Sequence, residues 1–203
     1  GISRMNRIAL SGEAFVHIMK VCGAIIDTKY SRGYFSYIYL KVEGEQVTAY
    51  GTNGYAVAYT KENLLESSEP CEILIPVTKA QKGVAQVTIE SDDHSVAIKY
   101  LYNDPNKLDQ GVVSTVPDAA QFPKGIISTV ETIRKEETSF TVGFAQRQLN
   151  DALKAFGKSD ALYLQFSESH RGVFVRGYGA EPRVDDSCGI ILCPVRSKHI
   201  KND

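Results

Sequence analysis

The sequence has no tryptophan, two methionines and four cysteines in 203 residues, and the cysteines form no C-x-x-C pair. Scattered cysteines argue against a zinc site or a disulfide framework, so we interpret them as small buried apolar residues. No apolar run approaches the roughly 18–20 residues that a membrane-spanning helix needs, and the amino terminus lacks a signal-peptide pattern. These absences predict a soluble, cytoplasmic protein with no membrane partner.

An excess of positive charge is also missing. The chain has 23 Lys and Arg against 24 Asp and Glu, which gives a formal net charge of -1. This balance excludes a protein that grips nucleic acid through bulk charge, so any such role depends on where the cations lie. The remaining composition, 43% hydrophobic and 23% charged, is typical of one large globular domain or two small ones.

Motifs for catalysis and cofactor binding are absent as well. The sequence has no Walker A, dinucleotide-binding, zinc-protease or nucleophile-elbow pattern. Its four histidines are far apart, and the pairs Asp92-Asp93 and Asp185-Asp186 stand in turn-like contexts, where bonding to the backbone explains aspartate. We therefore expect no catalytic residue, no metal and no cofactor.

An order of strand, helix and strands occurs three times along the chain. The expected helices begin after Ser11, span 76–86, and contain Leu149, Ala152 and Leu153, each with apolar residues at helical spacing. Strands are expected before and after each helix, at 37–42, 46–50, 55–60, 72–75, 87–90, 96–101, 139–142, 161–166, 173–177 and 189–193, with turns at 43–45 and at Asn53-Gly54. The repetition indicates three units of roughly 55–65 residues.

A connector separates the second and third units. Three prolines, Pro105, Pro117 and Pro123, limit regular structure over 103–137. We expect a first domain at 6–130, built of two units, and a second at 138–203, built of one, with the boundary near 131–138.

Cations lie off the apolar stripe of each expected helix: Lys20 in the first, Lys79 and Lys82 in the second, Arg147 and Lys154 in the third. Such residues either solvate a helix face or, if the repeats bring the helices to one surface, present positive charge to one partner. The pattern alone leaves both interpretations open.

The segment 42–58, Val-Glu-Gly-Glu-Gln-Val-Thr-Ala-Tyr-Gly-Thr-Asn-Gly-Tyr-Ala-Val-Ala, resembles the strand-and-turn box of the bacterial sliding clamp, the β subunit of DNA polymerase III. Further segments resemble clamp motifs in family order: Ile73-Leu-Ile-Pro76, Gln121-Phe-Pro123, Val142-Gly-Phe144 with Leu149-Asn-Asp-Ala-Leu153, and Leu192-Cys-Pro-Val-Arg196. The resemblance covers residues 7–197. It departs from the family at Asn53 and Ala56, where clamps have Asp and often Arg, and the chain continues past Arg196.

The resemblance implies an α+β protein with the DNA-clamp fold, in which repeated strand-helix-strands units place antiparallel sheets outside and helices on one face. Residues 6–130 resemble the middle clamp domain and 138–203 the second half of the last. Because a clamp ring has about twelve units, three per chain would require about four chains in a closed ring. A lone third unit would expose a sheet edge and an apolar helix face, so we expect it to pair with another copy of itself.

The resemblance further implies a processivity factor for DNA polymerase that is not an enzyme. Its homo-oligomer would encircle double-stranded DNA, with Lys20, Lys79, Lys82, Arg147 and Lys154 facing the DNA. Peptides of the polymerase or other clients would bind at a site formed by Thr52, Gly54, Tyr55, Ala56, Val57, Pro123, Cys193, Pro194, Val195 and Arg196. Two alternatives remain: a clamp-derived adaptor that binds proteins without encircling DNA, and an unrelated α+β enzyme.

Overall fold

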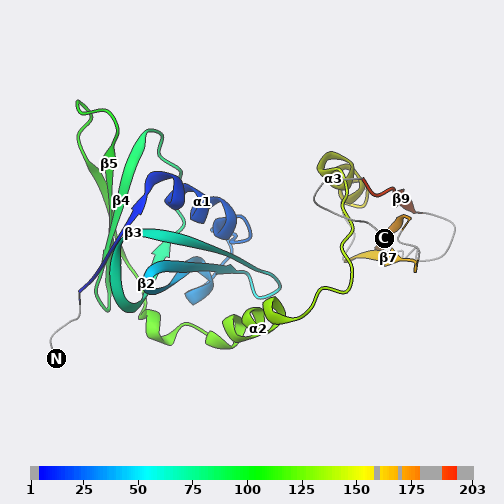
Figure 1. The fold of residues 1–203 in the computed structure, drawn as a ribbon, viewed down its shortest axis with the longest axis horizontal. Coiled ribbons are helices and arrows are strands. Elements are labelled where there is room, and N and C mark those ends of the chain that lie inside the picture. The colour runs from blue at the N-terminus through cyan, green and yellow to red at the C-terminus, as the bar shows by residue number, and fades with distance from the viewer. Residues whose placement is uncertain (1–4, 158–160, 169–170, 179–188, 196–203) are drawn as a thin grey trace. The chain divides into compact units, whose positions relative to one another are not determined.

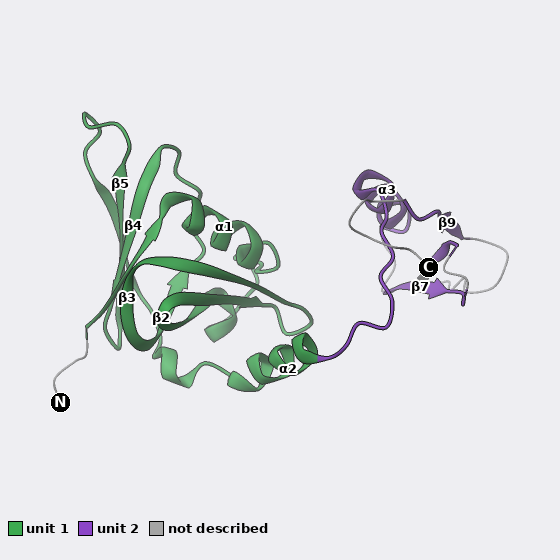
Figure 2. Cartoon of the chain, in the orientation of Figure 1, with its two compact units in different colours: residues 1–135 green, residues 136–203 purple. Residues whose placement is uncertain are grey.

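The computed structural model describes residues 5–157, 161–168, 171–178 and 189–195. It divides the chain into two units, residues 1–135 and 136–203, which are considered separately here (Figures 1 and 2). In the described residues, no helix is long and apolar enough to cross a membrane.

Unit 1 contains two long helices, two short 3-10 helices and six strands. In chain order these are β1 (Asn6–Ser11), α1 (Gly12–Gly23), η1 (Gly33–Ser36), β2 (Tyr37–Thr52), β3 (Val57–Pro76), β4 (Val84–Ser91), β5 (Ser95–Tyr102), β6 (Gln110–Thr115), η2 (Ala119–Gln121) and α2 (Lys124–Lys135). Two antiparallel sheets result, one in the order β1-β4-β5-β6 and the other a long hairpin of β2 and β3. Figure 1 shows α1 between the four-stranded sheet and this hairpin.

Helix α1 forms as predicted. The Ser11 hydroxyl accepts a hydrogen bond from the Ala14 N–H at 3.0 Å, which satisfies one of the free donors at the helix start. The apolar stripe of Phe15, Ile18 and Cys22 is buried against both sheets. This packing, rather than helix propensity, holds a helix of 12 residues in place.

The two sheets of unit 1 exchange strands across the helix layer. Strand β1, which directly precedes α1, pairs with β4, and β4 directly follows the loop 77–83. Residues 37–42 of β2, which follow α1, pair with 71–76 of β3, which directly precede that loop. We call α1 and the loop 77–83 the two inner segments of unit 1. The strand that precedes either inner segment therefore pairs with the strand that follows the other one.

Unit 2 has one helix and one sheet: α3 (Gln146–Ala155), β7 (Ala161–Phe166), β8 (Val173–Tyr178) and β9 (Ile190–Leu192), with antiparallel order β7-β8-β9. Its buried apolar core in the described residues is small. It contains Ala152 from α3, Val173 and Val175 from β8, and Leu192 from β9. Leu149 and Leu153 pack partly buried against it, as the helical spacing predicts.

The helix predicted at 76–86 is wrong. Pro76 ends β3, residues 77–83 contain no helix, and Gly83 has a φ of +73° that leads into β4. A β-carbon at Gly12 would meet the Val84 carbonyl oxygen at 1.9 Å, and one at Gly23 would meet Val77 Cγ1 at 3.3 Å. The segment thus runs beside α1, from its end back to its start, as a closely packed loop.

The connector predicted at 103–137 is also wrong in part, because β6 forms in its first half and α2 in its second half. The missed signal is the apolar spacing of Ile127 and Val130 after Pro123, a residue tolerated at a helix start. Conversely, residues 139–142, predicted as a strand, lie outside any strand. The turn predicted at 43–45 is a break in register within the continuous strand β2, where Gly44 has a φ of +60°.

Candidate nucleic-acid interface and peptide site

The exposed side of α1 has a mixture of charges. Glu13, His17 and Lys20 line an open depression of about 540 Å³ together with Glu62 of β3. His17 Nδ1 contacts a carboxylate oxygen of Glu62, and the Thr60 hydroxyl lies 2.9 Å from the same oxygen. Lys20 therefore shares this depression with two carboxylates, which offset its positive charge.

The other two predicted cations of unit 1 lie on the loop 77–83. Lys79 and Lys82 are exposed, and their loop is packed along α1, with the Thr78 N–H 3.5 Å from Met19 Sδ. The structure therefore brings the segments that carry Lys20, Lys79 and Lys82 side by side, although the helix predicted for two of them does not form.

The last two predicted cations belong to unit 2. Arg147 and Lys154 are both exposed on α3, at its start and in its last turn. Their helix buries Ala152 against the sheet, so both side chains lie off the packed stripe as the spacing predicts.

Sequence reasoning missed a polar cluster that joins α2 to the β2–β3 hairpin. The Tyr50 hydroxyl donates to Glu131 Oε1 at 2.7 Å, and Arg134 bonds the same carboxylate at 2.9 Å while lying 4.3 Å from the ring centre of Tyr59. Burial, followed by the hydrogen bond to Glu131, raises the pKa of Tyr50. The hydrogen bond from Tyr50 in turn lowers the pKa of Glu131. The cluster fixes α2 on the hairpin.

The predicted peptide-binding turn closes the β2–β3 hairpin. The Asn53 side chain accepts hydrogen bonds from the N–H groups of Tyr55 and Ala56, both at 2.9 Å, and Gly54 has a φ of +89°. Thr52 is buried, and its hydroxyl donates to the Ala56 carbonyl at 2.8 Å, so it stabilises the turn. Tyr55 is fully exposed at the tip, and Val57, at the start of β3, is half-buried against the core.

Pro123 is exposed immediately before α2. Its neighbour Phe122 is buried, stacks on Tyr39 with ring centres 4.7 Å apart, and meets the edge of Tyr34 at 6.2 Å. Burial raises the pKa of Tyr39, whose hydroxyl donates to Glu72 at 2.6 Å. In the Gln121-Phe-Pro123 segment, Phe122 thus holds the start of α2 against the core of unit 1, and Pro123 is left exposed to solvent.

The remaining predicted peptide-site residues lie in unit 2. Cys193 is exposed, Pro194 is half-buried, and the Val195 N–H donates to the Gly143 carbonyl at 2.9 Å. Arg196 lies outside the described residues. The predicted site therefore takes its residues from both units, and each part is formed within its own unit.

The paired aspartates behave as the turn interpretation predicts where they are described. Asp92 Oδ1 accepts the N–H groups of His94 and Ser95, both at 2.8 Å, and these bonds lower the pKa of Asp92. Asp185 and Asp186 lie outside the described residues. Among the residues that are described, no group of three or more His, Cys, Asp and Glu side chains could hold a metal ion.

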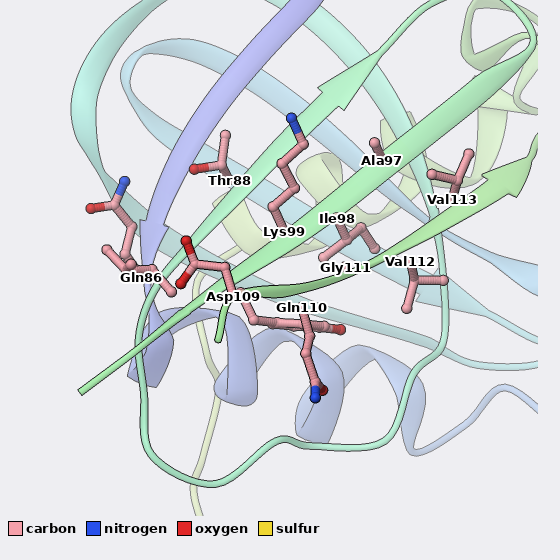
Figure 3. Close-up of a pocket in the computed structure, with 12 residues that line it drawn as sticks. Gln86, Thr88, Ala97, Ile98, Lys99, Asp109, Gln110, Gly111, Val112 and Val113 are labelled. Carbon is pink, nitrogen blue, oxygen red and sulfur yellow. The ribbon is translucent and has the colours of Figure 1, made fainter. Parts of the chain in front are cut away.

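A groove of about 510 Å³ lies on strands β4, β5 and β6 (Figure 3). Thr88 and Lys99 line one side of it, and Val112 and Val113 of β6 line the other. Val113 is 77% exposed, and β6, QGVVST, contains no charged residue. This strand forms an open edge of the sheet within the described residues.

The cysteines divide into buried and exposed positions. Cys22 is buried, as interpreted from the sequence, and burial raises the pKa of its thiol to about 12. Cys71 is half-buried with a raised pKa, also because of burial. Cys193 is exposed, so the interpretation of a buried residue is wrong there, and Cys188 lies outside the described residues.

This difference predicts selective labelling. Because the thiolate is the nucleophile, a thiol reagent at pH 8 should modify Cys193 at least about tenfold faster than Cys22 in the native protein, and both at similar rates in urea. Peptide mass spectrometry after timed quenching measures each rate. Equal native rates would contradict the burial of Cys22.

Antiparallel sheets that pair their strands around helix α1 and the loop 77–83, which runs antiparallel to it, define an α+β protein with the DNA-clamp fold, which confirms the predicted fold class. Solved structures that match it include β subunits of DNA polymerase III. That of Pseudomonas aeruginosa has 18% identity and a TM-score of 0.55, with 86% of this chain and 47% of that chain covered.

Two further structures agree. A putative β subunit from Eubacterium rectale has 10% identity and a TM-score of 0.64, over 96% of this chain and 52% of that one. The Helicobacter pylori β clamp bound to a DNA ligase peptide has 17% identity and a TM-score of 0.52, over 93% and 56%. The sequence matches no family model and no curated protein. The likeness establishes the fold, and the chain spans about half the length of these clamps.

Proposed function

We propose that this chain is a short sliding-clamp protein whose homo-oligomer encloses duplex DNA and tethers partner proteins to it without catalysing a reaction. The observation that carries the proposal is that the clamp fold extends over 86–96% of the chain, across both units. The other features described below fit that use of the fold.

Self-association follows from length. Since the chain spans about half of each matched clamp, a ring of comparable size needs about twice as many chains, which we put at about four. Among the described strands, uncharged sheet edges that could make such contacts include β6 in unit 1 and β7 in unit 2. Natural proteins rarely leave uncharged edges unpaired, because they would pair at random with other chains.

The charge pattern suits sliding. Lys20, Lys79 and Lys82 come from adjacent segments, but Glu13 and Glu62 lie near Lys20. A ring that cannot dissociate sideways needs weak phosphate contacts, because each tight contact would slow its movement and add salt dependence. On this proposal Arg147 and Lys154 of α3 also face the DNA.

Partner proteins would bind through short peptides, as the ligase peptide does in the Helicobacter pylori clamp. The exposed Tyr55 at the hairpin tip, Pro123, and the segment Cys193–Val195 offer apolar and backbone groups for such a peptide. Thr52 and Gly54 would act by shaping the turn.

The topological difference between circular and linear DNA tests the proposal. Protein assembled on a nicked plasmid is passed through a sizing column in 0.2 M salt, before and after the plasmid is cut once. We expect at least about tenfold more protein to remain with the circle, because a ring slides off a free end. Equal retention, or none on either form, would contradict encirclement and favour the protein-binding adaptor.

A further inference from the structure

Strand β7 is an incomplete edge of the unit 2 sheet. On one side β7 pairs with β8 from Ala161↔Tyr178 to Phe166↔Val173, and on the other side no described strand pairs with it. All six of its residues are exposed, and its sequence, ALYLQF, has no charge and no proline. Such a strand has the composition of a paired strand rather than of a protected edge.

An apolar row along β7 is also left uncovered. The pairs Leu164↔Val175 and Phe166↔Val173 put Leu164 and Phe166 on the sheet face where Val173 and Val175 are buried with α3. Yet Leu162, Leu164 and Phe166 are 37%, 48% and 42% exposed, so the helix covers β8 and leaves β7 open.

Unit 1 shows what fills the equivalent edge. There β4, the strand after the inner loop 77–83, is flanked by β1, the strand that directly precedes α1, in antiparallel register from Asn6↔Ser91 to Ser11↔Gln86. Residues 37–42, after α1, are likewise flanked by 71–76 of β3, before the loop. In both cases, a strand that follows one inner segment is paired with the strand that precedes the other inner segment. It is not paired with the strand that precedes its own inner segment.

Among the described residues of unit 2, α3 is the one segment of this kind, and no second one is present there to supply the equivalent strand. The residues that precede α3 are 139–142, Ser-Phe-Thr-Val, whose pattern predicts a strand but which lie outside every strand of the described chain. We propose that residues 139–142 of a second copy of this chain pair antiparallel with β7, and that the second copy receives the same strand in return.

Charge and area fit a second copy as the occupant. Residues 139–142 and 161–166 carry no charge, so the pairing sets no like charges opposite each other. Within one chain, the ring centres of Phe140 and Phe166 lie 5.8 Å apart, so an aromatic ring from residues 139–142 can pack against the apolar row of β7. With Phe140 49% exposed, the four side chains expose roughly 300 Å² per copy, at ~150–200 Å² per large side chain. Two copies thus supply about 600 Å², close to the apolar part of a 1,200 Å² interface.

This inference deepens the proposed function and rests on the self-association that it requires. The exchange is reciprocal, so it forms a closed two-fold dimer. In each copy, residues 139–142 of the other copy complete a four-stranded sheet with β7, β8 and β9. The exchange makes a matching pair of sheets from two half-sized units, each of which has only a small buried apolar core among its described residues.

The test compares molar masses of the full chain without DNA, by light scattering across 1–100 µM. Thr141→Pro removes a strand N–H donor and should halve the mass of the assembly, whereas Glu137→Pro, four residues earlier in the exposed connector, should keep it. Leu164→Lys should also halve the mass, and Leu65→Lys, a similarly exposed strand residue of unit 1, should not. Far-UV circular dichroism identifies which variants are folded. If Thr141→Pro is unfolded, the comparison of Leu164→Lys with Leu65→Lys tests the exchange instead.

A monomeric wild-type chain, or masses that Thr141→Pro and Leu164→Lys leave unchanged, would overturn the exchange. Hydrogen exchange provides an independent measurement: amides of 139–142 and 161–166 should become at least tenfold more protected together as concentration rises, and independence from concentration would also overturn it. A chain that exchanges strands but is not retained on circular DNA would leave this inference standing and contradict encirclement.

Discussion

Combined replacement of Lys20, Lys79 and Lys82 by glutamate is expected to lower retention on circular DNA at least tenfold in 0.1 M salt. The three lysines come from α1 and from the loop packed along it, so they belong to one side of unit 1. Removing one lysine–phosphate interaction should also reduce the slope of log affinity against log salt by about 1. We expect a total reduction in slope of about 2–3, measured by fluorescence polarisation with a labelled duplex.

The matched control replaces three exposed lysines elsewhere on unit 1. Lys29→Glu, Lys99→Glu and Lys107→Glu change the net charge by the same amount, and their contacts are surface interactions with Tyr30, Glu90 and Tyr102. The control should retain at least half of the wild-type binding. An equal loss in both triple variants would mean that net charge, rather than the α1 side of the unit, governs DNA binding.

Gly12→Ala is expected to destabilise unit 1 by about 3 kcal/mol or more. A β-carbon at this position would meet the Val84 carbonyl oxygen at 1.9 Å, and backbone cannot move aside as a flexible side chain would. Gly51→Ala should have a similar effect, because its β-carbon would meet the Cys22 carbonyl oxygen at 2.2 Å. Urea unfolding followed by circular dichroism measures both changes in the free energy of unfolding.

Gly125 provides the control for this prediction. It lies in α2 with nothing within 4 Å of an added β-carbon, so Gly125→Ala should stabilise the protein by about 0.5–1 kcal/mol through helix propensity. If Gly12→Ala were as stable as the wild type, the close approach of Val84, the residue that follows the loop 77–83, to the start of α1 would be contradicted, and the proximity of Lys79 and Lys82 to Lys20 would lose part of its support.

Local patterns predicted the elements whose apolar residues repeat with one period. The stripe of α1, the alternation in β4 and β5, and the Asn53-Gly54 turn all form as expected, because each leaves a pattern that can be read within one short stretch of sequence. The predictions failed where spacing was ambiguous. Residues 77–83 have helical spacing, but they form a loop beside α1 because Pro76 completes β3 and Gly83 bends the chain into β4.

The exposure of some candidate residues could be predicted for the same reason. Exposed cations off an apolar stripe can be read from one helix at a time, and Arg147 and Lys154 lie where this reading predicts. The cluster of Tyr50, Glu131 and Arg134 could not be read, because it joins residues 81 apart in sequence through packing of a helix that the prolines concealed. Polar residues that meet only in the folded structure produce no periodic pattern in the sequence.

The amino-acid sequence by itself determined the α+β composition, the order of its motifs and the half-length resemblance to a clamp, since these depend on local pattern. The tertiary structure decided which strands exchange across the inner layer, that a loop replaces the second helix, and that β7 forms the edge of its sheet. The physical reason is that a strand's partner is chosen by backbone hydrogen bonds and burial across the fold, and neighbouring residues do not specify either.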